Sequence, residues 1–131
     1  MSGAEHRRVE TATTVLRIAV SLEFLGHGLL ALSHKATWMK YVAFWGVPAS
    51  AIPEVMTAVG TLDVVLAFIV LAKPVRGALL WMAFWGFFTA TLRPLTGEPF
   101  VEFVERGPNW GAPLALLILR GWPHRWADLW K

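Results

Sequence analysis

The chain has 131 residues, of which 56% are hydrophobic and 16% are charged, and its net charge is +3. A soluble domain averages about 25% charged residues, so this composition leaves little surface for water and indicates an integral membrane protein. The isoelectric point of about 9.8 does not indicate nucleic-acid binding, because lysine and arginine stand singly or in pairs at the ends of apolar runs. The absence of cysteine excludes disulfides, thiolate ligands and thiol redox relays.

The hydrophobic pattern predicts an all-α fold, an integral membrane four-helix bundle that forms one transmembrane domain over the whole chain. The predicted spans are residues 14–32, 53–72, 75–92 and 108–121. The basic N-terminus superficially resembles a secretory signal, but Arg17, Glu23 and His27 interrupt the following apolar run, so we expect a retained span. We expect Arg93-Pro94 to stop the third span. The fourth predicted span is shorter than the ~20 residues that a helix needs to cross a bilayer perpendicularly.

The connections between the predicted spans set the expected topology. Lys73-Pro74 is a tight turn, so the second and third spans should be antiparallel neighbours. The connections 34–52 and 94–107 are long, partly amphipathic, and should lie on the same side of the membrane. The other side carries the larger share of the basic residues, namely Arg7, Arg8, Lys73, Arg76, Arg120, Arg125 and Lys131. The positive-inside rule therefore predicts that both termini are cytoplasmic and both long loops external.

Tryptophans are expected at both membrane interfaces. With this topology, Trp38, Trp45 and Trp110 fall at the outer interface, and Trp122, Trp126 and Trp130 fall at the inner one. The last eleven residues, GWPHRWADLWK, are predicted to form a short interfacial helix.

A stripe of ionisable residues crosses the first span. At about 100° per residue, Glu23, His27 and His34 fall within about 40° of one another on a helical wheel. Charge is costly in hydrocarbon, so Glu23 and His27 are candidates for function, whereas His34 follows the span and is interpreted as a boundary residue. Asp63 lies at a similar depth in the second span and is predicted to pair with Glu23 across the bundle.

Two interpretations of Glu23 and Asp63 remain open. They could handle protons or a cation, or bond to the polar head group of a ligand within the bundle. Alternatively, they could be structural carboxylates, satisfied by one of four residues: Arg17, Arg93, Thr57 or Thr61.

Further polar residues gather near the outer face, which indicates a polar pocket that opens outward. Glu54, Arg93 and Asn109 are the candidate ligand-binding residues there, together with Arg17 in the first span. Arg93 could hold an anionic group, neutralise an inward carboxylate, or simply snorkel to the interface. A second group, Glu98, Glu102 and Glu105, is interpreted as the solvated face of an interfacial helix.

No metal site is predicted. His27 stands between Gly26 and Gly28, which leaves space for another helix or a flat ligand. His34 is seven residues away, about 10 Å along a helix, too far to share a mononuclear metal. No second clear ligand on another span supports haem, so haem is disfavoured and the residues alone leave the cofactor open. Motifs of soluble enzymes such as GxGxxG, GxSxG and HExxH are absent.

Several stretches together resemble the DoxX family and its DoxX-like relatives, small four-span bacterial membrane proteins. The resemblance lies in LRIAVSLEFLGHGLLAL and in FWGVPASAIPEVMTAVGTLDVVLAF, together about a third of the chain. It implies a four-helix bundle in the bacterial cytoplasmic membrane, associated with redox chemistry. By position, Arg17, His27, Glu54 and Asp63 match the family's polar residues.

Two functions follow as expectations. In the first, the protein takes part in membrane redox chemistry and binds a quinone-like ligand, with Glu23, His27 and Asp63 as the catalytic residues. In the second, it is a non-catalytic subunit or assembly factor of a larger membrane oxidoreductase complex. The expected partners are the lipid bilayer and either a protein partner or further copies of the chain, and not nucleic acid. A proton-coupled transporter is disfavoured because the four spans contain no inverted repeat.

Overall fold

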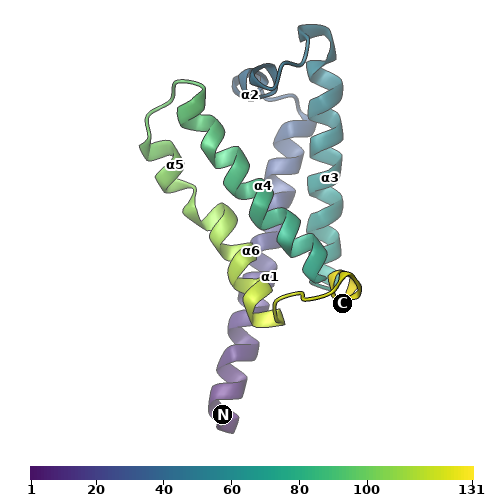
Figure 1. Cartoon of the computed structure of the whole chain (residues 1–131), viewed down its shortest axis with the longest axis vertical. Helices are drawn as coiled ribbons and strands as arrows, with labels where there is room; N and C mark the ends of the chain where they lie inside the picture. The colour runs from purple at the N-terminus through teal and green to yellow at the C-terminus, as the bar shows by residue number, and fades with distance from the viewer.

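The chain folds into helices without any strand, in a computed structural model that describes residues 1–131 (Figure 1). The α-helices are α1 (Gly3–Leu32), α2 (Met39–Phe44), α3 (Ile52–Ala72), α4 (Arg76–Leu95), α5 (Val101–Glu105) and α6 (Gly107–Arg120). Three short 3-10 helices lie in the connections and at the C-terminus: η1 (Ala36–Trp38), η2 (Ala49–Ala51) and η3 (Trp126–Trp130). The all-α prediction is thereby confirmed.

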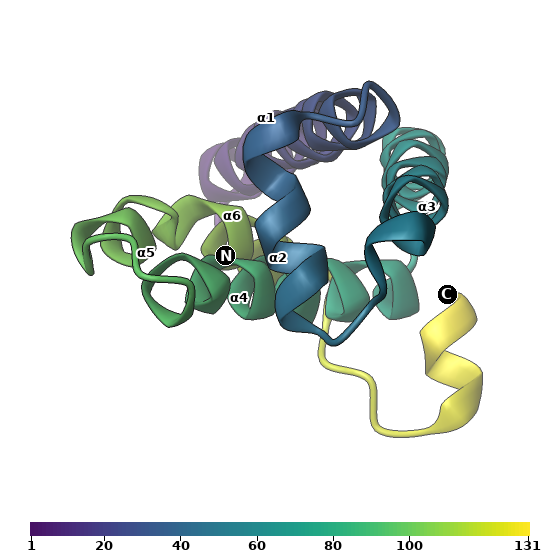
Figure 2. The ribbon, with the colours of Figure 1, turned by 90° about the horizontal axis from the view of Figure 1, so that it is seen from above.

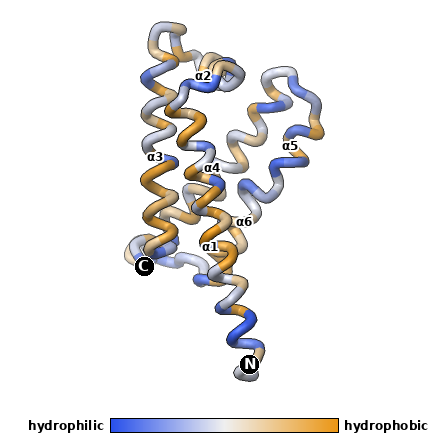
Figure 3. Tube along the Cα trace, turned by 180° about the vertical axis from the view of Figure 1, so that it is seen from behind, coloured by the Kyte–Doolittle hydropathy of each residue, from blue (hydrophilic) through white to orange (hydrophobic).

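Helix α1 begins eleven residues before the segment predicted for it. Ser2 caps the helix: its hydroxyl accepts a hydrogen bond from the Glu5 N–H at 3.2 Å, and the Glu5 carboxylate accepts one from the Ser2 N–H at 2.6 Å. This reciprocal arrangement satisfies two backbone donors that the first turn leaves free. The basic N-terminus therefore continues the helix as a hydrophilic extension that projects beyond the other helices (Figure 1, Figure 3).

The predicted stop at Arg93-Pro94 is wrong, because α4 continues to Leu95. Proline lacks an N–H and so costs a helix one backbone hydrogen bond outside its first turn, and α4 ends one residue after Pro94. The hydroxyl of Thr96 donates to the Leu92 carbonyl at 2.7 Å, which satisfies one of the terminal acceptors. Helices α3 and α6 agree with the predicted segments to within one residue at each end.

Two stretches are long and apolar enough to cross a membrane, Gly3–Leu32 and Ala49–Ala72. The 20-residue α4 is not among them, because its tryptophans, glycine and threonines and the arginines near its ends lower its mean hydropathy. The 14 residues of α6 are too few as well, since they span about 21 Å against a hydrocarbon core of about 30 Å.

The helices pack in two pairs around a common core. Helix α1 lies along α3, and α4 lies along α6, which also contacts α1 (Figure 1, Figure 2). The core contains Val20 and Phe24 of α1, Leu66 and Val70 of α3, Leu79 and Met82 of α4, and Leu116 and Leu117 of α6. The prediction that α3 and α4 are neighbours holds only near their turn, because α4 then inclines away from α3 and toward α5 (Figure 1).

Helices α1 and α3 touch backbone to backbone at two glycines. A Cβ atom at Gly60 would lie 2.7 Å from the Gly28 carbonyl oxygen, and one at Gly28 would lie 2.9 Å from the Gly60 carbonyl oxygen. Of the two uses predicted for the space beside His27, Gly28 therefore serves the approach of another helix. A Cβ atom at Gly26 would meet no atom within 4 Å, so Gly26 takes no part in this contact.

The two long connections lie at one end of the molecule, and both termini lie toward the other (Figure 1). The C-terminal segment returns against the start of α4, where the Arg76 side chain donates to the Arg120 carbonyl at 2.7 Å and Gly77 contacts the Leu129 backbone. Of the predicted terminal helix only Trp126–Trp130 is helical, as the 3-10 helix η3, in which Trp126 and Trp130 are exposed.

Candidate functional site

A pocket lies between α1, α3, α4 and α6, beneath α2. Its non-atom space is about 670 Å³, which includes the solvent in the open mouth. Five of the predicted site residues line it together, namely Glu23, His27, Asp63, Arg93 and Asn109. Residues far apart in the sequence thus meet in one place.

One wall of the pocket carries the two carboxylates. Glu23 and Asp63 come from the paired helices α1 and α3, and Asp63 is only 4% exposed. Glu23 Oε1 and Asp63 Oδ1 are buried and accept no hydrogen bond from the chain. Since unsatisfied buried polar atoms are costly, native proteins seldom keep them without a use.

None of the possible structural partners pairs with these carboxylates. Thr57 bonds to His34 Nε2 at 2.8 Å, and the Thr61 hydroxyl donates to the Thr57 carbonyl at 2.8 Å. Arg17 and Arg93 form no salt bridge with either carboxylate. The interpretation of Glu23 and Asp63 as internally satisfied structural acids is therefore not supported.

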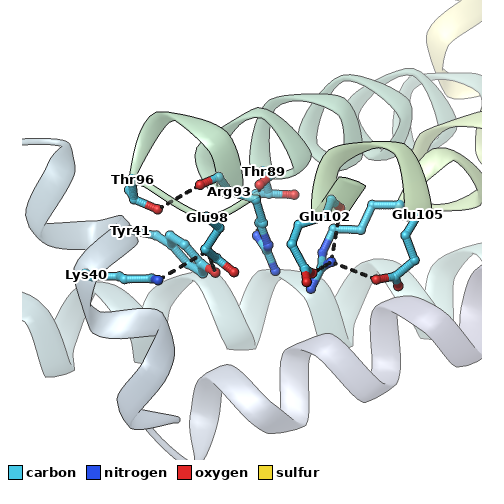
Figure 4. A network of polar contacts seen from close by, with 9 residues as sticks. Lys40, Tyr41, Thr89, Arg93, Thr96, Glu98, Glu102 and Glu105 are labelled. Carbon is cyan, nitrogen blue, oxygen red and sulfur yellow. Dashed lines mark hydrogen bonds and ion pairs between the residues drawn. The ribbon is translucent and has the colours of Figure 1, made fainter. Parts of the chain in front are cut away.

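Arg93 lies inside the pocket instead of snorkelling to an interface, and it is 5% exposed. Its Nη1 donates to the Thr89 carbonyl at 2.8 Å, and its guanidinium carbon lies 4.4 Å from the centre of the Tyr41 ring (Figure 4). Its Nε has no acceptor. A buried guanidinium held by an aromatic face and one carbonyl keeps donors free for an anionic or carbonyl oxygen.

Aromatic side chains from the 34–52 connection complete the walls. The Trp38 ring meets the His27 ring edge-on at 5.6 Å, and Trp45 packs on Trp85 with the ring centres 5.8 Å apart. The Trp45 Nε1 is buried without an acceptor. The prediction that Trp38 and Trp45 form an interfacial belt misses this role. The signal for it is the run of Trp38, Tyr41 and Trp45 at near-helical spacing in a connection.

Glu98 holds helix α2 in place over the pocket through contacts with two of its residues. The Tyr41 hydroxyl donates to the Glu98 carboxylate, and Lys40 Nζ lies 3.3 Å from the same group (Figure 4). Glu98 is therefore not part of a solvated face, whereas Glu102 and Glu105 are at the surface and pair with Arg106 at 3.1 and 3.5 Å.

The environment shifts the pKa values of both Tyr41 and Glu98. Burial, and then the hydrogen bond to Glu98, raise the pKa of Tyr41 from 10.0 to about 12. Although partial burial opposes it, hydrogen bonds from Tyr41 and Lys40 hold the pKa of Glu98 below its usual range. The contact is thus strongest when Tyr41 is neutral and Glu98 is ionised.

Replacing Tyr41 with phenylalanine is expected to lower the thermal stability only in a defined pH window. The depressed pKa of Glu98 means that its stabilisation is present above its ordinary value of 4.5 and is lost as the pH falls further. The raised pKa of Tyr41 means that its stabilisation is present below 10.0 and is lost as the pH rises toward about 12. Melting temperatures of the wild type and Tyr41→Phe, measured against pH in detergent, should converge at both extremes. A difference that does not vary with pH would contradict the assignment.

Two predicted ligand-binding residues are not brought to the pocket. Glu54 is exposed in the first turn of α3, nine residues from Asp63, which at about 100° per residue places the two on opposite faces. Arg17 is six residues from Glu23, about 120° around α1, and its Nε is buried without a partner. His34 lies outside the pocket in a left-handed conformation with φ 53°, consistent with a boundary residue.

In comparisons with protein-family models, curated proteins and solved structures, nothing matches this chain. The resemblance to the DoxX family therefore stays a prediction from the two stretches in α1 and around α3. No three His, Asp or Glu side chains lie close enough together to hold a metal ion.

Proposed function

We propose that this chain is an integral membrane four-helix protein of DoxX type that binds a quinone-like ligand and takes part in membrane redox chemistry. The observation that carries the proposal is the pocket, in which aromatic walls surround buried polar atoms that the chain itself leaves unpaired. Such a combination is typical of a site for an apolar ring with polar substituents.

The outer surface supports placement in a bilayer. Large hydrophobic side chains are exposed along all four long helices, including Leu22 and Leu29 of α1, Val65 and Phe68 of α3, Phe84 and Phe87 of α4, and Ile118 and Leu119 of α6. Soluble monomers rarely expose apolar surface so widely. In our proposal α4 and the short α6 cross beside α1 and α3, both termini are cytoplasmic, and the pocket opens outward toward the bacterial cell exterior.

The pocket residues suit the chemistry of a quinone. A flat ring fits against Trp38, Trp45 and Trp85, while its carbonyl oxygens can accept hydrogen bonds from Arg93 and Asn109. Reduction of a quinone takes up two electrons and two protons. The electrons would come from a redox protein of the same membrane, and Glu23 and Asp63 are placed to exchange the protons, with His27 beside them.

Purified protein is expected to bind 2,3-dimethyl-1,4-naphthoquinone with quenching of tryptophan fluorescence, because three tryptophans line the pocket. Glu23→Gln and His27→Ala should each weaken binding by about tenfold, the effect of losing roughly 1.4 kcal/mol. Glu10→Gln serves as the control, since Glu10 is exposed on the same helix. Absorption spectra and mass analysis of a solvent extract should reveal co-purified quinone. Finding neither co-purified quinone nor binding of the added probe would refute the proposal.

A second function is favoured by the apolar surface at the pocket end. Leu95 at the end of α4 is exposed, as are Phe100, Val101 and Val104 in the connection to α6, where a partner protein could cover them. The chain would then be a non-catalytic subunit or assembly factor of a larger oxidoreductase complex. Purification in mild detergent separates the two functions: a stoichiometric foreign partner without quinone supports the second, and a quinone-loaded protein the first.

A further inference from the structure

We infer that the ligand of the pocket carries a long apolar tail, which leaves the pocket sideways between α3 and α4 and ends in the lipid. This inference rests on the proposed function and deepens it, because it names a lipid-tailed ligand instead of a bare ring. It follows from the way in which each side of the pocket is closed.

The seam between α3 and α4 has an aromatic flank on the α4 side. The two helices lie close only near their turn, and α4 then inclines away from α3 (Figure 1). Trp85 lines the pocket, and the Trp81 ring stacks on it with the ring centres 5.6 Å apart and the planes at 12°. Phe84 packs on Trp81 at 5.8 Å and is 57% exposed. These rings form a continuous apolar surface from the pocket wall to the outside of the bundle.

The α3 flank of the same seam is aliphatic. Val59 lines the pocket, and Leu62 lies three residues further along α3 with 44% of its surface exposed. Leu62 is about 200° around the helix from Gly60, the residue that contacts α1. It therefore lies on the flank of α3 that is turned away from α1. Both flanks of the seam offer hydrocarbon to a passing tail.

Two other seams of the bundle are closed by backbone contacts. Helices α1 and α3 touch at Gly28 and Gly60, as described above. Helices α4 and α6 meet at Gly86, where a Cβ atom would lie 2.9 Å from the Asn109 carbonyl carbon. Helices that approach so closely leave no space for a hydrocarbon chain between them.

The remaining sides of the pocket are polar. Glu23, His27 and Asn109 line it between α1 and α6 and are half-buried. At the outer end, Lys35 Nζ lies 5.0 Å from the centre of the Trp38 ring, which lines the pocket. A hydrocarbon tail on either path would cover polar groups without bonding to them, which is costly. An apolar tail is therefore best accommodated between α3 and α4, where it also stays out of water.

The first test locates the tail in the wild-type protein. The probe is 2-methyl-1,4-naphthoquinone with a ten-carbon chain at position 3 that ends in a photoreactive diazirine. It is irradiated with the full-length protein in detergent, and labelled peptides are identified by mass spectrometry. Only labels that an excess of 2,3-dimethyl-1,4-naphthoquinone suppresses are counted. We expect them in α3 around Leu62 and in α4 around Trp81 and Phe84. Labels confined to α1, α6 or the outer connections would overturn the inference.

The second test blocks the seam chemically. The chain contains no cysteine, so Leu62→Cys creates one site for a bulky maleimide. Its modification should weaken binding of 2-methyl-3-geranyl-1,4-naphthoquinone by at least about fivefold more than binding of the tail-less dimethyl probe. Each modified protein is compared with the same variant before modification, so partitioning of the tail into detergent cancels.

Phe68→Cys is the matched control for the blocking experiment. Phe68 is 57% exposed on the same helix, but it lies beside Leu22 and Leu25 of α1 on the other flank of α3. Its modification should leave both dissociation constants unchanged. Equal effects of modification at the two positions, with the dimethyl probe still bound, would overturn the inference and leave the proposed function standing. Failure of the wild type to bind either probe would overturn the proposed function itself.

Discussion

Replacing Gly28 with alanine is expected to destabilise the protein by about 1–3 kcal/mol, the usual cost of overpacking a tight contact. The new Cβ would lie 2.7 Å from Val64 Cγ2, 2.9 Å from the Gly60 carbonyl oxygen and 3.0 Å from the Val64 amide nitrogen. Backbone atoms cannot turn away as the end of a side chain can, so α1 and α3 must separate. Thermal unfolding followed by circular dichroism in detergent measures the loss.

The neighbouring glycine provides a matched control for this substitution. Gly26 lies on the same helix and a Cβ there would meet no atom within 4 Å. Gly26→Ala should therefore be neutral or slightly stabilising, because alanine is the better helix former. Gly28→Ala combined with Gly60→Ala should cost less than the two single changes together, since the helices need to separate only once. Equal effects of Gly26→Ala and Gly28→Ala would contradict the proposed backbone contact.

The contact between Gly28 and Gly60 also affects the shape of the pocket. His27 precedes Gly28, and Asp63 lies one turn after Gly60, so separation of α1 and α3 would widen the wall that carries the carboxylates. The loss of stability should therefore be accompanied by weaker binding of the naphthoquinone probe. This link explains why a site built on two long helices depends on residues that do not touch a ligand.

The helices can be predicted from the sequence more fully than their arrangement. Apolar runs locate α3 and α6 closely, because hydrophobicity and proline position act locally. The start of α1 at Gly3 escapes prediction because its cap, Ser2 with Glu5, precedes a polar stretch that gives no apolar signal. The inclination of α4 away from α3 depends on packing against α6, where the Gly86 position meets the Asn109 backbone. No local pattern records such a contact.

The residues of the candidate site, like the helices, can be predicted from the sequence only in part. Glu23, His27 and Asp63 can be found because charge at that depth in an apolar helix is conspicuous. The roles of Tyr41 and Glu98 cannot, because their contact joins two connections 57 residues apart. Glu54 matches the other outer polar residues in depth, but depth alone does not tell which face of α3 a residue occupies.

Replacing Arg93 with methionine is expected to raise the thermal stability while weakening ligand binding. Arg93 is 5% exposed and forms no direct salt bridge; its guanidinium contacts the Thr89 carbonyl and the aromatic faces of Trp38 and Tyr41. Burying a charge without an ionic partner is costly, and an apolar side chain of similar length removes that cost while filling the same space. We expect a gain of about 1–4 kcal/mol in unfolding free energy, together with at least about tenfold weaker binding of the naphthoquinone probe.

Opposite changes in stability and binding would identify Arg93 as a residue kept for its ligand, since replacing a purely structural arginine would lower the stability. Arg106→Met is the matched control: Arg106 is partly exposed and pairs with Glu102 at 3.1 Å near the surface. Exposed pairs contribute about 0–1 kcal/mol, so this variant should change stability little and binding not at all. A loss of stability in Arg93→Met with unchanged binding would show that the guanidinium holds α2 and α4 together instead, through its contact with the Tyr41 ring.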